Sequence, residues 1–434
     1  MKPRFSFIKY LYLVLLLLLA CRMFSIQASR GREYSQAAAV QRWRNTKIYT
    51  ERGDVLDRNG IRFTNRSKQD IAVILPADLL KDASALSRAA ELLGRQTGEL
   101  EEAAARSYLP YSVRVSEEQA NAIMDAGITG LSILEVPVRN SEDMLAAHII
   151  GYVDEKGEEG LSGIEKAYQD TLKNGGGVFA GVLADAGDTA MEQFGYRIQD
   201  TTGVGRLNIR TTLDYHMQEI VEETMDLMVD RGAVVILDIL NGDLLAMASR
   251  PAFNPSDVGS ALKDKAQPLF NRALGEYIPG SIFKIVTAAA ALEKGISPET
   301  SFDCPGYVMM GDLMMKCWNY DRGGHGTLNM AQGFAQSCNS YFISLGQMVG
   351  KRDIIAMAER LGLGKRTGLY LQGIGEPYGL LPNTMGYTSA AETANLSIGQ
   401  GDLLISPVQA ARLVSVIANG GILNRVSVID CIVN

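Results

Sequence analysis

The sequence predicts an α+β fold in which helices pack on an antiparallel sheet, and three observations lead to this fold class. An amphipathic stretch, 215–230, precedes two short apolar runs, 232–238 and 243–249, with Asn241-Gly242 between them. Asn-Gly between apolar runs is the strongest short-range signal for a β-hairpin. Apolar helical patterns then follow at 282–291, 330–349, 352–361 and 407–418. A hairpin followed by a block of helices is typical of α+β proteins.

The first 48 residues carry most of the positive charge of the chain. They contain nine Lys or Arg residues and one acid, Glu33, whereas the remainder has a net charge of −15. An acidic body argues against nucleic acid as a partner, because nucleic-acid-binding domains present a basic surface. The basic residues surround an apolar stretch, which indicates a membrane segment.

The apolar core of this segment, 10–21, reaches the length of a spanning helix only if 5–26 is counted. The preceding basic residues predict a single-pass signal anchor at 1–26, with the body outside the cytoplasm. Two alternatives stay open. One is a cleaved signal peptide, and the other is a lipoprotein signal at Cys21, although Arg22 directly after it counts against lipidation.

The region from 27 to 211 shows weaker patterns. Residues 84–106 have helical periodicity, and 119–150 mix helix and strand patterns. Residues 57–60 are a turn signal between two extended runs. The glycines at 175–177 precede no helix with a nucleotide fingerprint, so we expect a hairpin there and not a phosphate-binding loop.

The cysteines give no metal-binding pattern. The chain has three histidines and no Cys-x-x-Cys pair or evident Cys/His cluster. The sequence therefore predicts neither a metal site nor a cofactor. The five cysteines are Cys21, Cys304, Cys317, Cys338 and Cys431.

The strongest candidate for chemistry is the segment 279–284. A proline and a glycine break the chain before an apolar run, 282–291, which should form a buried helix. Ser281 and Lys284 are three residues apart and therefore share one helix face. Desolvation lowers the pKa of a buried lysine, and a neutral amine can take the proton of a serine. The alternative is a Ser–Lys pair that serves only helix packing.

A second candidate is Ser337-Cys338-Asn339, which is the one Ser-x-Asn of the sequence. Ser337 and Asn339 could bring a hydroxyl and an amide to the first pair. The alternative is a helix cap or a polar turn, since both residue types favour such positions. His325 lies between two glycines, and we interpret it as part of a tight turn.

With these motifs in this order, the sequence resembles the class B penicillin-binding proteins, which are monofunctional peptidoglycan D,D-transpeptidases. Within this family, the sequence is most similar to the division and sporulation members of Gram-positive bacteria. It extends from the anchor to the C-terminus and includes RGDVLDRNG (52–60), GYVD (151–154), GLSGIE (160–165), PGSIFK (279–284), GHG (324–326), SCN (337–339) and SIGQG (397–401).

The resemblance implies three domains. They are an anchor at 1–26, an elongated α+β pedestal of the dimerisation type at 27–211, and a transpeptidase domain at 212–434. The last would have the fold shared by penicillin-binding transpeptidases and serine β-lactamases. The implied partners are D-Ala-D-Ala stem peptides, β-lactams, the membrane, a glycan polymerase and proteins of division or sporulation.

The resemblance also implies residue roles. Ser281 would attack the penultimate D-Ala of a stem peptide, with Lys284 as the base. Ser337 and Asn339 would relay protons and hold the substrate amide. The residues expected to line the substrate site are Gly280, Cys338, Gly399, Gln400 and Gly401.

The chain departs from the family at its third motif, Lys-Thr/Ser-Gly, which should follow 399–401. No such tripeptide occurs between there and Asn434, and the similar segment 365–368 comes too early, so we interpret it as a loop. The motif's strand supplies an oxyanion-hole donor, and losing one donor typically costs a factor of about 10²–10³ in rate. We therefore expect a truncated or frameshifted chain, with an incomplete domain and little activity.

Cys317 and Cys338 raise a further hypothesis. A disulfide between them would pull on the Ser-x-Asn segment and could respond to redox state. Free buried thiols, or a bridge from Cys304 to Cys317, are the alternatives.

Two other functions compete with transpeptidation. A catalytically inactive scaffold of the division or sporulation machinery would fit the missing third motif. A membrane-bound β-lactam sensor shares the Ser-x-x-Lys fold, but the long region with RGDVLDRNG argues against it. Acylation by a penicillin separates an enzyme from a scaffold.

Overall fold

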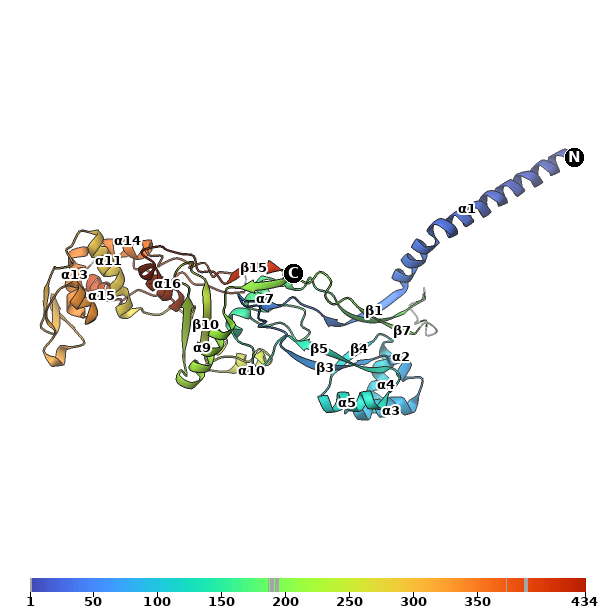
Figure 1. The fold of residues 1–434 in the computed structure, drawn as a ribbon, viewed down its shortest axis with the longest axis horizontal. Coiled ribbons are helices and arrows are strands. Elements are labelled where there is room, and N and C mark those ends of the chain that lie inside the picture. The colour runs from blue at the N-terminus through green and yellow to red at the C-terminus, as the bar shows by residue number, and fades with distance from the viewer. Residues whose placement is uncertain (1, 186, 188–190, 192–194, 372, 386–388) are drawn as a thin grey trace. The chain divides into compact units, whose positions relative to one another are not determined.

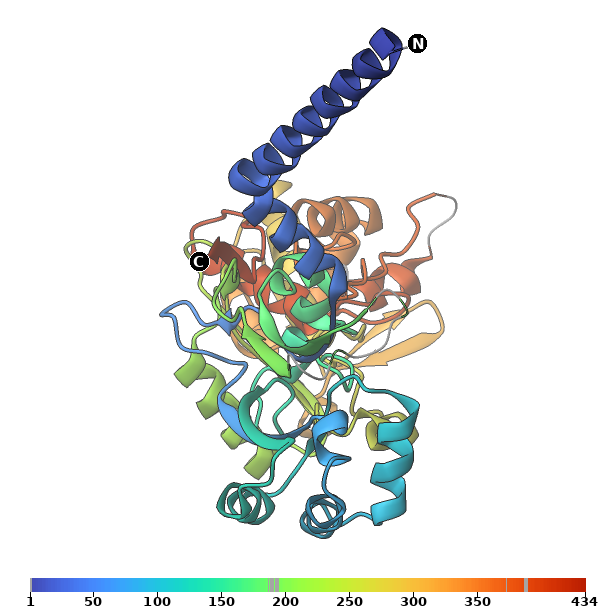
Figure 2. The same cartoon turned by 90° about the vertical axis from the view of Figure 1, so that its right-hand side faces the viewer.

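The computed structural model describes residues 2–185, 187, 191, 195–371, 373–385 and 389–434 (Figures 1 and 2). The chain forms two compact units, and it has the α+β fold class that the sequence predicts. Unit 1 comprises Met1–Glu51, Lys68–Pro137 and Gly176–Val204. Unit 2 comprises Arg52–Ser67, Val138–Gly175 and Gly205–Asn434, so two segments of the predicted pedestal pack with the C-terminal half.

The chain begins with helix α1 (Lys2–Arg42), drawn in blue in Figure 1. Its stretch Phe7–Tyr34 has a mean hydropathy of 2.0 and is exposed throughout its most apolar window. In the described part of the chain it is the one helix long and apolar enough to cross a membrane. The helix continues past residue 26, because Ala37-Ala38-Ala39 and their neighbours favour helix. Met1, the first residue of the predicted anchor, lies outside the described residues.

Unit 1 contains two three-stranded sheets. The first has the order β1-β6-β7, and its neighbouring strands are antiparallel. The second has the order β4-β3-β5. The strands are β1 (Trp43–Thr50), β3 (Ser67–Ile74), β4 (Tyr111–Arg114), β5 (Leu131–Val138), β6 (Gly177–Leu183) and β7 (Tyr196–Asp200).

Strand β3 is buried on both faces at its C-terminal end. Ala72 and Ile74 belong to a cluster with residues of the unit's helices, whereas Ile71 and Val73 belong to a second cluster with residues of β1, β5 and β6. This division follows from the two-residue period of a strand. Figure 1 shows the helices beside this sheet: α2 (Pro76–Leu79), α3 (Ala83–Leu92), α4 (Thr97–Arg106) and α5 (Glu117–Ala126).

Unit 2 begins with a sheet made from three distant segments. Strand β8 (Asn208–Thr211) pairs in parallel with β2 (Val55–Leu56) and antiparallel with β15 (Ile429–Val433). Val55 and Ile209 are completely buried here in one hydrophobic cluster. The short helices α6 (Ala147–Ile150), α7 (Gly163–Ala167) and α8 (Gln169–Leu172) contribute further buried residues to this cluster.

The predicted helix and hairpin are confirmed. Helix α9 (Tyr215–Met228) packs against β10 (Leu244–Arg250), which pairs antiparallel with β9 (Gly232–Leu237). The side-chain amide of Gln218 joins helix and strand, because it donates to the carbonyl of Met247 and accepts from its N–H, both at 2.8 Å. Gly242 in the hairpin loop has a φ of +82°, and a Cβ there would lie 2.5 Å from a neighbouring backbone oxygen.

The rest of unit 2 is mainly helical. A second hydrophobic cluster surrounds α13, and Gly346 lets this helix approach α15 closely, since a Cβ would lie 1.7 Å from the Ser397 hydroxyl. The helices are α10 (Val258–Lys263), α11 (Lys284–Glu293), α12 (Met330–Ala335), α13 (Asn339–Val349), α14 (Lys351–Arg360), α15 (Ala390–Ser397) and α16 (Pro407–Ala418). Four short strands accompany them: β11 (Phe302–Cys304), β12 (Tyr307–Met310), β13 (Leu313–Lys316) and β14 (Gly326–Leu328).

A buried charge cluster joins two of the segments that make up unit 2. The Glu165 carboxylate accepts from Arg52 Nη2 at 2.7 Å and from Arg139 Nε at 2.6 Å. The exposed fractions of these three side chains are 1%, 2% and 8%. Burial lowers the pKa of the Arg52 guanidinium, against the opposing attraction of Glu165. The stability of this cluster therefore depends on the Glu165 carboxylate, which both arginines contact.

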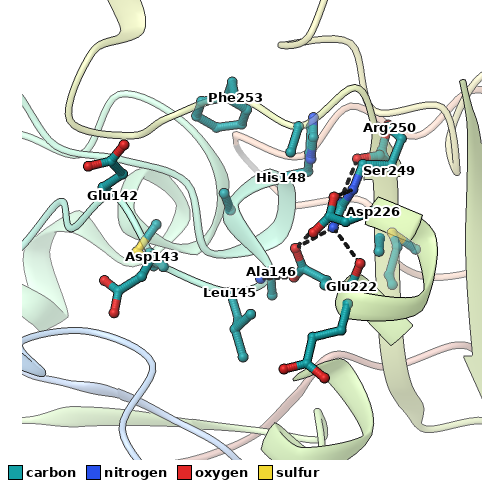
Figure 3. Close-up of a pocket in the computed structure, with 16 residues that line it drawn as sticks. Glu142, Asp143, Leu145, Ala146, His148, Glu222, Asp226, Ser249, Arg250 and Phe253 are labelled. Carbon is teal, nitrogen blue, oxygen red and sulfur yellow. Dashed lines mark hydrogen bonds and ion pairs between the residues drawn. The ribbon is translucent and has the colours of Figure 1, made fainter. Parts of the chain in front are cut away.

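A cavity of about 220 Å³ lies in unit 2 between the segment 142–148, α9 and β10 (Figure 3). Arg250 donates to Asp226 at 2.6 Å and to the Glu222 carboxylate at 3.3 Å. His148 contacts a backbone carbonyl, and burial lowers its pKa to about 4, so the ring is neutral at pH 7. Each of these groups has a hydrogen-bond partner, and none of the candidate catalytic residues lines this cavity.

Candidate active site

Ser281 lies in a tight turn at the start of helix α11. The turn is a 3₁₀ helix, Gly280–Phe283, which runs directly into α11. Gly280 has a φ of +59°, and its N–H donates to the carbonyl of Gly399 at 3.0 Å. A Cβ on Gly399 would lie 2.0 Å from the Gly280 oxygen, so the two glycines permit a close backbone contact. This contact fixes the turn that presents the exposed Ser281.

Lys284 lies beneath this turn with an exposed fraction of 2%. Its Nζ is 3.2 Å from Ser281 Oγ and 3.1 Å from Ser337 Oγ. It also lies 2.7 Å from the Ser337 carbonyl oxygen and 2.8 Å from Asn339 Oδ1. The structure thus brings together all four residues that the sequence predicts as catalytic.

The four contacts of Nζ fit a neutral amine. Carbonyl oxygens only accept hydrogen bonds, so those of Ser337 and Asn339 take the two N–H groups of a neutral lysine. The remaining lone pair then faces hydroxyls, which can donate to it. In this arrangement Lys284 can accept the proton of Ser281.

Burial shifts the protonation equilibrium of Lys284 toward the same neutral state. Burial lowers the pKa of Lys284 from 10.5 to about 8, while the nearby Cys317 and Cys338 oppose this shift. A lysine with this pKa is neutral in a useful fraction of molecules near neutral pH, which a general base requires.

Ser337 occupies an unusual backbone position. The sequence prediction of one helix over 330–349 is wrong here, because α12 ends at Ala335 and α13 begins at Asn339. The N–H of Ser337 donates to the carbonyl of Phe334 and that of Cys338 donates to Gly333, which is a Schellman motif. Ser337 has a φ of +48°, where glycine is usual and other residues are strained. The strained serine places its hydroxyl and carbonyl beside Lys284.

The residues predicted to line the substrate site fall into two groups. The first group lies at or next to the turn that holds Ser281. Gly280 and Gly399 form the close backbone contact of this turn, and Gln400 and Gly401 directly follow Gly399. Cys338 differs, because its side chain is completely buried and its Sγ accepts from the N–H of Tyr341. Substrate binding by these residues stays a prediction.

Cys338 lies in a cluster that the sequence analysis missed. The potential ligand atoms of Cys304, Cys317, His325 and Cys338 all lie within 4.8 Å of one another. Burial raises the pKa of the Cys338 thiol to about 12. Their spacings in the sequence resemble no common metal motif, and the only signal was the occurrence of three cysteines and a histidine within 35 residues.

All five cysteines are free in this structure. Cys317 Sγ and Cys338 Sγ lie 3.9 Å apart, whereas a disulfide has an S–S distance of about 2.05 Å. The predicted redox disulfide therefore stays a prediction.

Comparison with known proteins covers both units. The penicillin-binding protein transpeptidase domain matches residues 232–434, and the penicillin-binding protein dimerisation domain matches residues 47–179. The chain is 27% identical over 97% of its length to stage V sporulation protein D of Bacillus subtilis, and covers 66% of that protein. It is also 27% identical to the peptidoglycan D,D-transpeptidase MrdA of Acinetobacter baumannii, with 97% of this chain and 68% of that protein covered. It thus spans about two thirds of the length of these curated relatives.

Solved structures agree in fold. A complex of a penicillin-binding protein, PBP2, with MreC from Helicobacter pylori contains a chain with 20% identity and a TM-score of 0.67, covering 89% of this chain and 78% of that one. A peptidoglycan synthase complex that coordinates polymerization and crosslinking contains a chain with 25% identity and a TM-score of 0.68, covering 99% of this chain and 80% of that one. The order of motifs, both domain matches and the relatives agree: the chain belongs to the class B penicillin-binding proteins.

Proposed function

We propose that this protein is a serine-type peptidoglycan D,D-transpeptidase. The observation that carries the proposal is the position of Lys284 Nζ, 3.2 Å from Ser281 Oγ, with two carbonyl oxygens available for its N–H groups. The name of the relative MrdA, a peptidoglycan D,D-transpeptidase, supports the same reaction. The substrate that we propose is the D-Ala-D-Ala stem peptide.

The geometry supports a two-step acyl transfer. Ser281 Oγ attacks the carbonyl carbon of the penultimate D-Ala, while Lys284 Nζ takes the hydroxyl proton. When the tetrahedral intermediate collapses, the C–N bond breaks and the departing D-Ala nitrogen takes a proton, for which Ser337 Oγ offers a path from Nζ. The amine of a second stem then attacks the ester, forms the cross-link and returns the proton to Ser281.

A β-lactam would react by the first step alone. Ser281 would open the strained ring amide, and the ring nitrogen would take the proton. Because the leaving nitrogen stays tethered to the acyl group, the ester would persist as a stable adduct. This adduct provides the assay for the proposal.

We expect the protein to be located at the cell membrane. We infer that the apolar stretch Phe7–Tyr34 anchors the chain by a single pass, with both units outside the cytoplasm. Solved relatives form complexes with MreC and within a peptidoglycan synthase. We extend this to a glycan polymerase and proteins of division or sporulation as partners of this chain.

A polypeptide of these 434 residues should be acylated slowly. The sequence after Gly401 contains no lysine, so it offers no Lys-Thr-Gly strand. Among the described residues, β9 pairs with β10 alone. Without the oxyanion donor of that strand, we expect a rate about 10²–10³ below that of a relative that contains it. Labelling with a fluorescent penicillin, followed by peptide mapping to Ser281, measures the rate.

The same experiment separates the two candidate functions. Slow labelling confined to Ser281 supports an impaired transpeptidase. No adduct after long incubation would favour the alternative of a catalytically inactive scaffold. Rapid labelling at the rate of complete relatives would contradict the impairment.

The acylation rate should rise with pH through an apparent pKa of about 8. Lys284 accepts a proton only as the neutral amine, so the reactive fraction falls as pH drops below this value. Intact-mass time courses between about pH 6 and pH 10 measure the profile. A rate that is constant or decreases over this range would rule out Lys284 as the base.

A further inference from the structure

Three arginines lie toward the C-terminal end of the apolar stretch of helix α1. Arg22, Arg30 and Arg32 are exposed, and among the described residues their side chains have no hydrogen-bond or ion-pair partner. Glu33 is the one acid in the segment 22–33, so three positive charges and one negative charge give this segment a net charge of +2. Its arginines are therefore available to bind an anionic partner outside the protein.

The height of these arginines along the helix corresponds to the headgroup region of a bilayer. Residues 5–26 extend over about 33 Å, which covers a hydrocarbon core of about 30 Å. Arg30 and Arg32 lie about 6–9 Å beyond residue 26, and the headgroup region is about 5–8 Å thick on each side. Arg22 can reach the same region with its long side chain. Tyr34 is exposed nearby, and tyrosine favours this interface.

The three arginines face different sides of the helix. Successive residues of an α-helix are rotated by about 100°, so Arg30 and Arg32 are about 160° apart around its axis. Arg22 lies between them, about 80° from each. A partner protein that packs against one side of α1 would reach only part of this set, whereas lipid headgroups surround a spanning helix. The distribution therefore favours lipids as the partner.

We propose that Arg22, Arg30 and Arg32 bind the phosphate groups of anionic phospholipids and thereby fix the depth of α1 in the bilayer. A guanidinium group matches the geometry of phosphate and forms charge-assisted hydrogen bonds with it. Anionic polymers outside the membrane offer the same chemical group, but the phosphates of the headgroups lie at the level of these side chains. The proposal rests on the inferred membrane anchor and does not depend on the transpeptidase reaction.

A fixed depth of α1 sets the height of strand β1 above the membrane. Helix α1 ends at Arg42 and β1 begins at the next residue, Trp43, so no linker separates them. Arg42 lies about 15 Å beyond Arg32 along the helix. Headgroup charges are screened at that distance, because the Debye length is about 8 Å in physiological salt. Arg42 should therefore take no part in lipid binding, although it is also exposed.

Lipid association of the full chain in vesicles tests the proposal. The vesicles contain phosphatidylcholine and phosphatidylglycerol, and the electron paramagnetic resonance spectrum of a spin-labelled lipid measures the fraction held at the protein. The wild-type chain should hold labelled phosphatidylglycerol in preference to labelled phosphatidylcholine. Arg30→Gln and Arg32→Gln should each lower this preference, by up to about fivefold for the loss of one basic group at an anionic surface.

Arg42→Gln is the matched control and should leave the preference unchanged. The basic residues at 2–9 contribute equally in every variant, so the comparison isolates the arginines at the other end of the span. Raising the salt concentration to about 1 M, where the Debye length is about 3 Å, should weaken the preference of the wild-type chain.

Equal association of both lipids with the inserted wild-type chain would overturn the proposal. A loss of preference in Arg42→Gln as large as that in Arg30→Gln would overturn it as well, because the effect would not depend on headgroup height. A loss in only one of Arg30→Gln and Arg32→Gln would favour a protein partner on one side instead. Flotation with the vesicles checks insertion separately. A chain that does not float has no anchor, and the proposal fails with it, whereas penicillin labelling of Ser281 still tests the transpeptidase.

Discussion

Replacing Lys284 with methionine should lower the rate of Ser281 acylation by a factor of about 10²–10⁴, the usual contribution of a general base. Methionine keeps an unbranched apolar side chain in the buried space but cannot accept the proton. It also leaves the carbonyl oxygens of Ser337 and Asn339 without a donor from Nζ. Time courses of adduct formation with a penicillin, followed by intact mass, measure the effect.

The chain offers a matched control in the Ser-x-x-Lys segment at 260–263. Lys263 is exposed at the end of α10, three residues after Ser260. Lys263→Met should leave the acylation rate unchanged. Ser281→Ala should give no adduct at all. If Lys284→Met reacted as fast as the wild type, the proposed role of Lys284 would have to be abandoned.

Replacing Glu165 with glutamine should lower the free energy of unfolding of unit 2 by about 3–5 kcal/mol. The substitution removes the carboxylate that faces Arg52 and Arg139, and leaves the two buried guanidinium groups without the carboxylate that they contact. Urea unfolding in a Trp43→Phe background, followed by the fluorescence of Trp318 in unit 2, measures the change.

Glu155→Gln is the control for this substitution, because Glu155 is exposed in the same segment of unit 2. It should change the free energy of unfolding by less than about 0.5 kcal/mol. A similarly small effect for Glu165→Gln would mean that the two arginines find other partners, or that water reaches the cluster.

Elements with a strong local signal could be predicted from the sequence. The helix at 407–418 has its predicted bounds, because Ser406 and Pro407 mark its start and Asn419-Gly420 its end. The division of the chain into units could not be predicted, since the burial of 52–67 depends on strands far away in the sequence.

The candidate site could likewise be predicted from the sequence only where its contacts are local. The Ser281–Lys284 pair follows from helix geometry alone. The approach of Ser337 and Asn339 is a contact over more than 50 residues. The residues alone offered it beside the alternative of a cap or turn, and the family resemblance then favoured it. The break before α13 was missed because it uses a serine where the usual signal is glycine.

The sheet β2-β8-β15 has a consequence for biosynthesis. Strands β2 and β15 are about 370 residues apart, yet both pair with β8. At about 5–20 residues per second, roughly 20–75 s separate the emergence of the first strand from the ribosome and that of the last. During this interval Val55 and its neighbours lack part of the residues that bury them in the folded protein. The growing polypeptide therefore exposes apolar surface that chaperones would have to shield from aggregation.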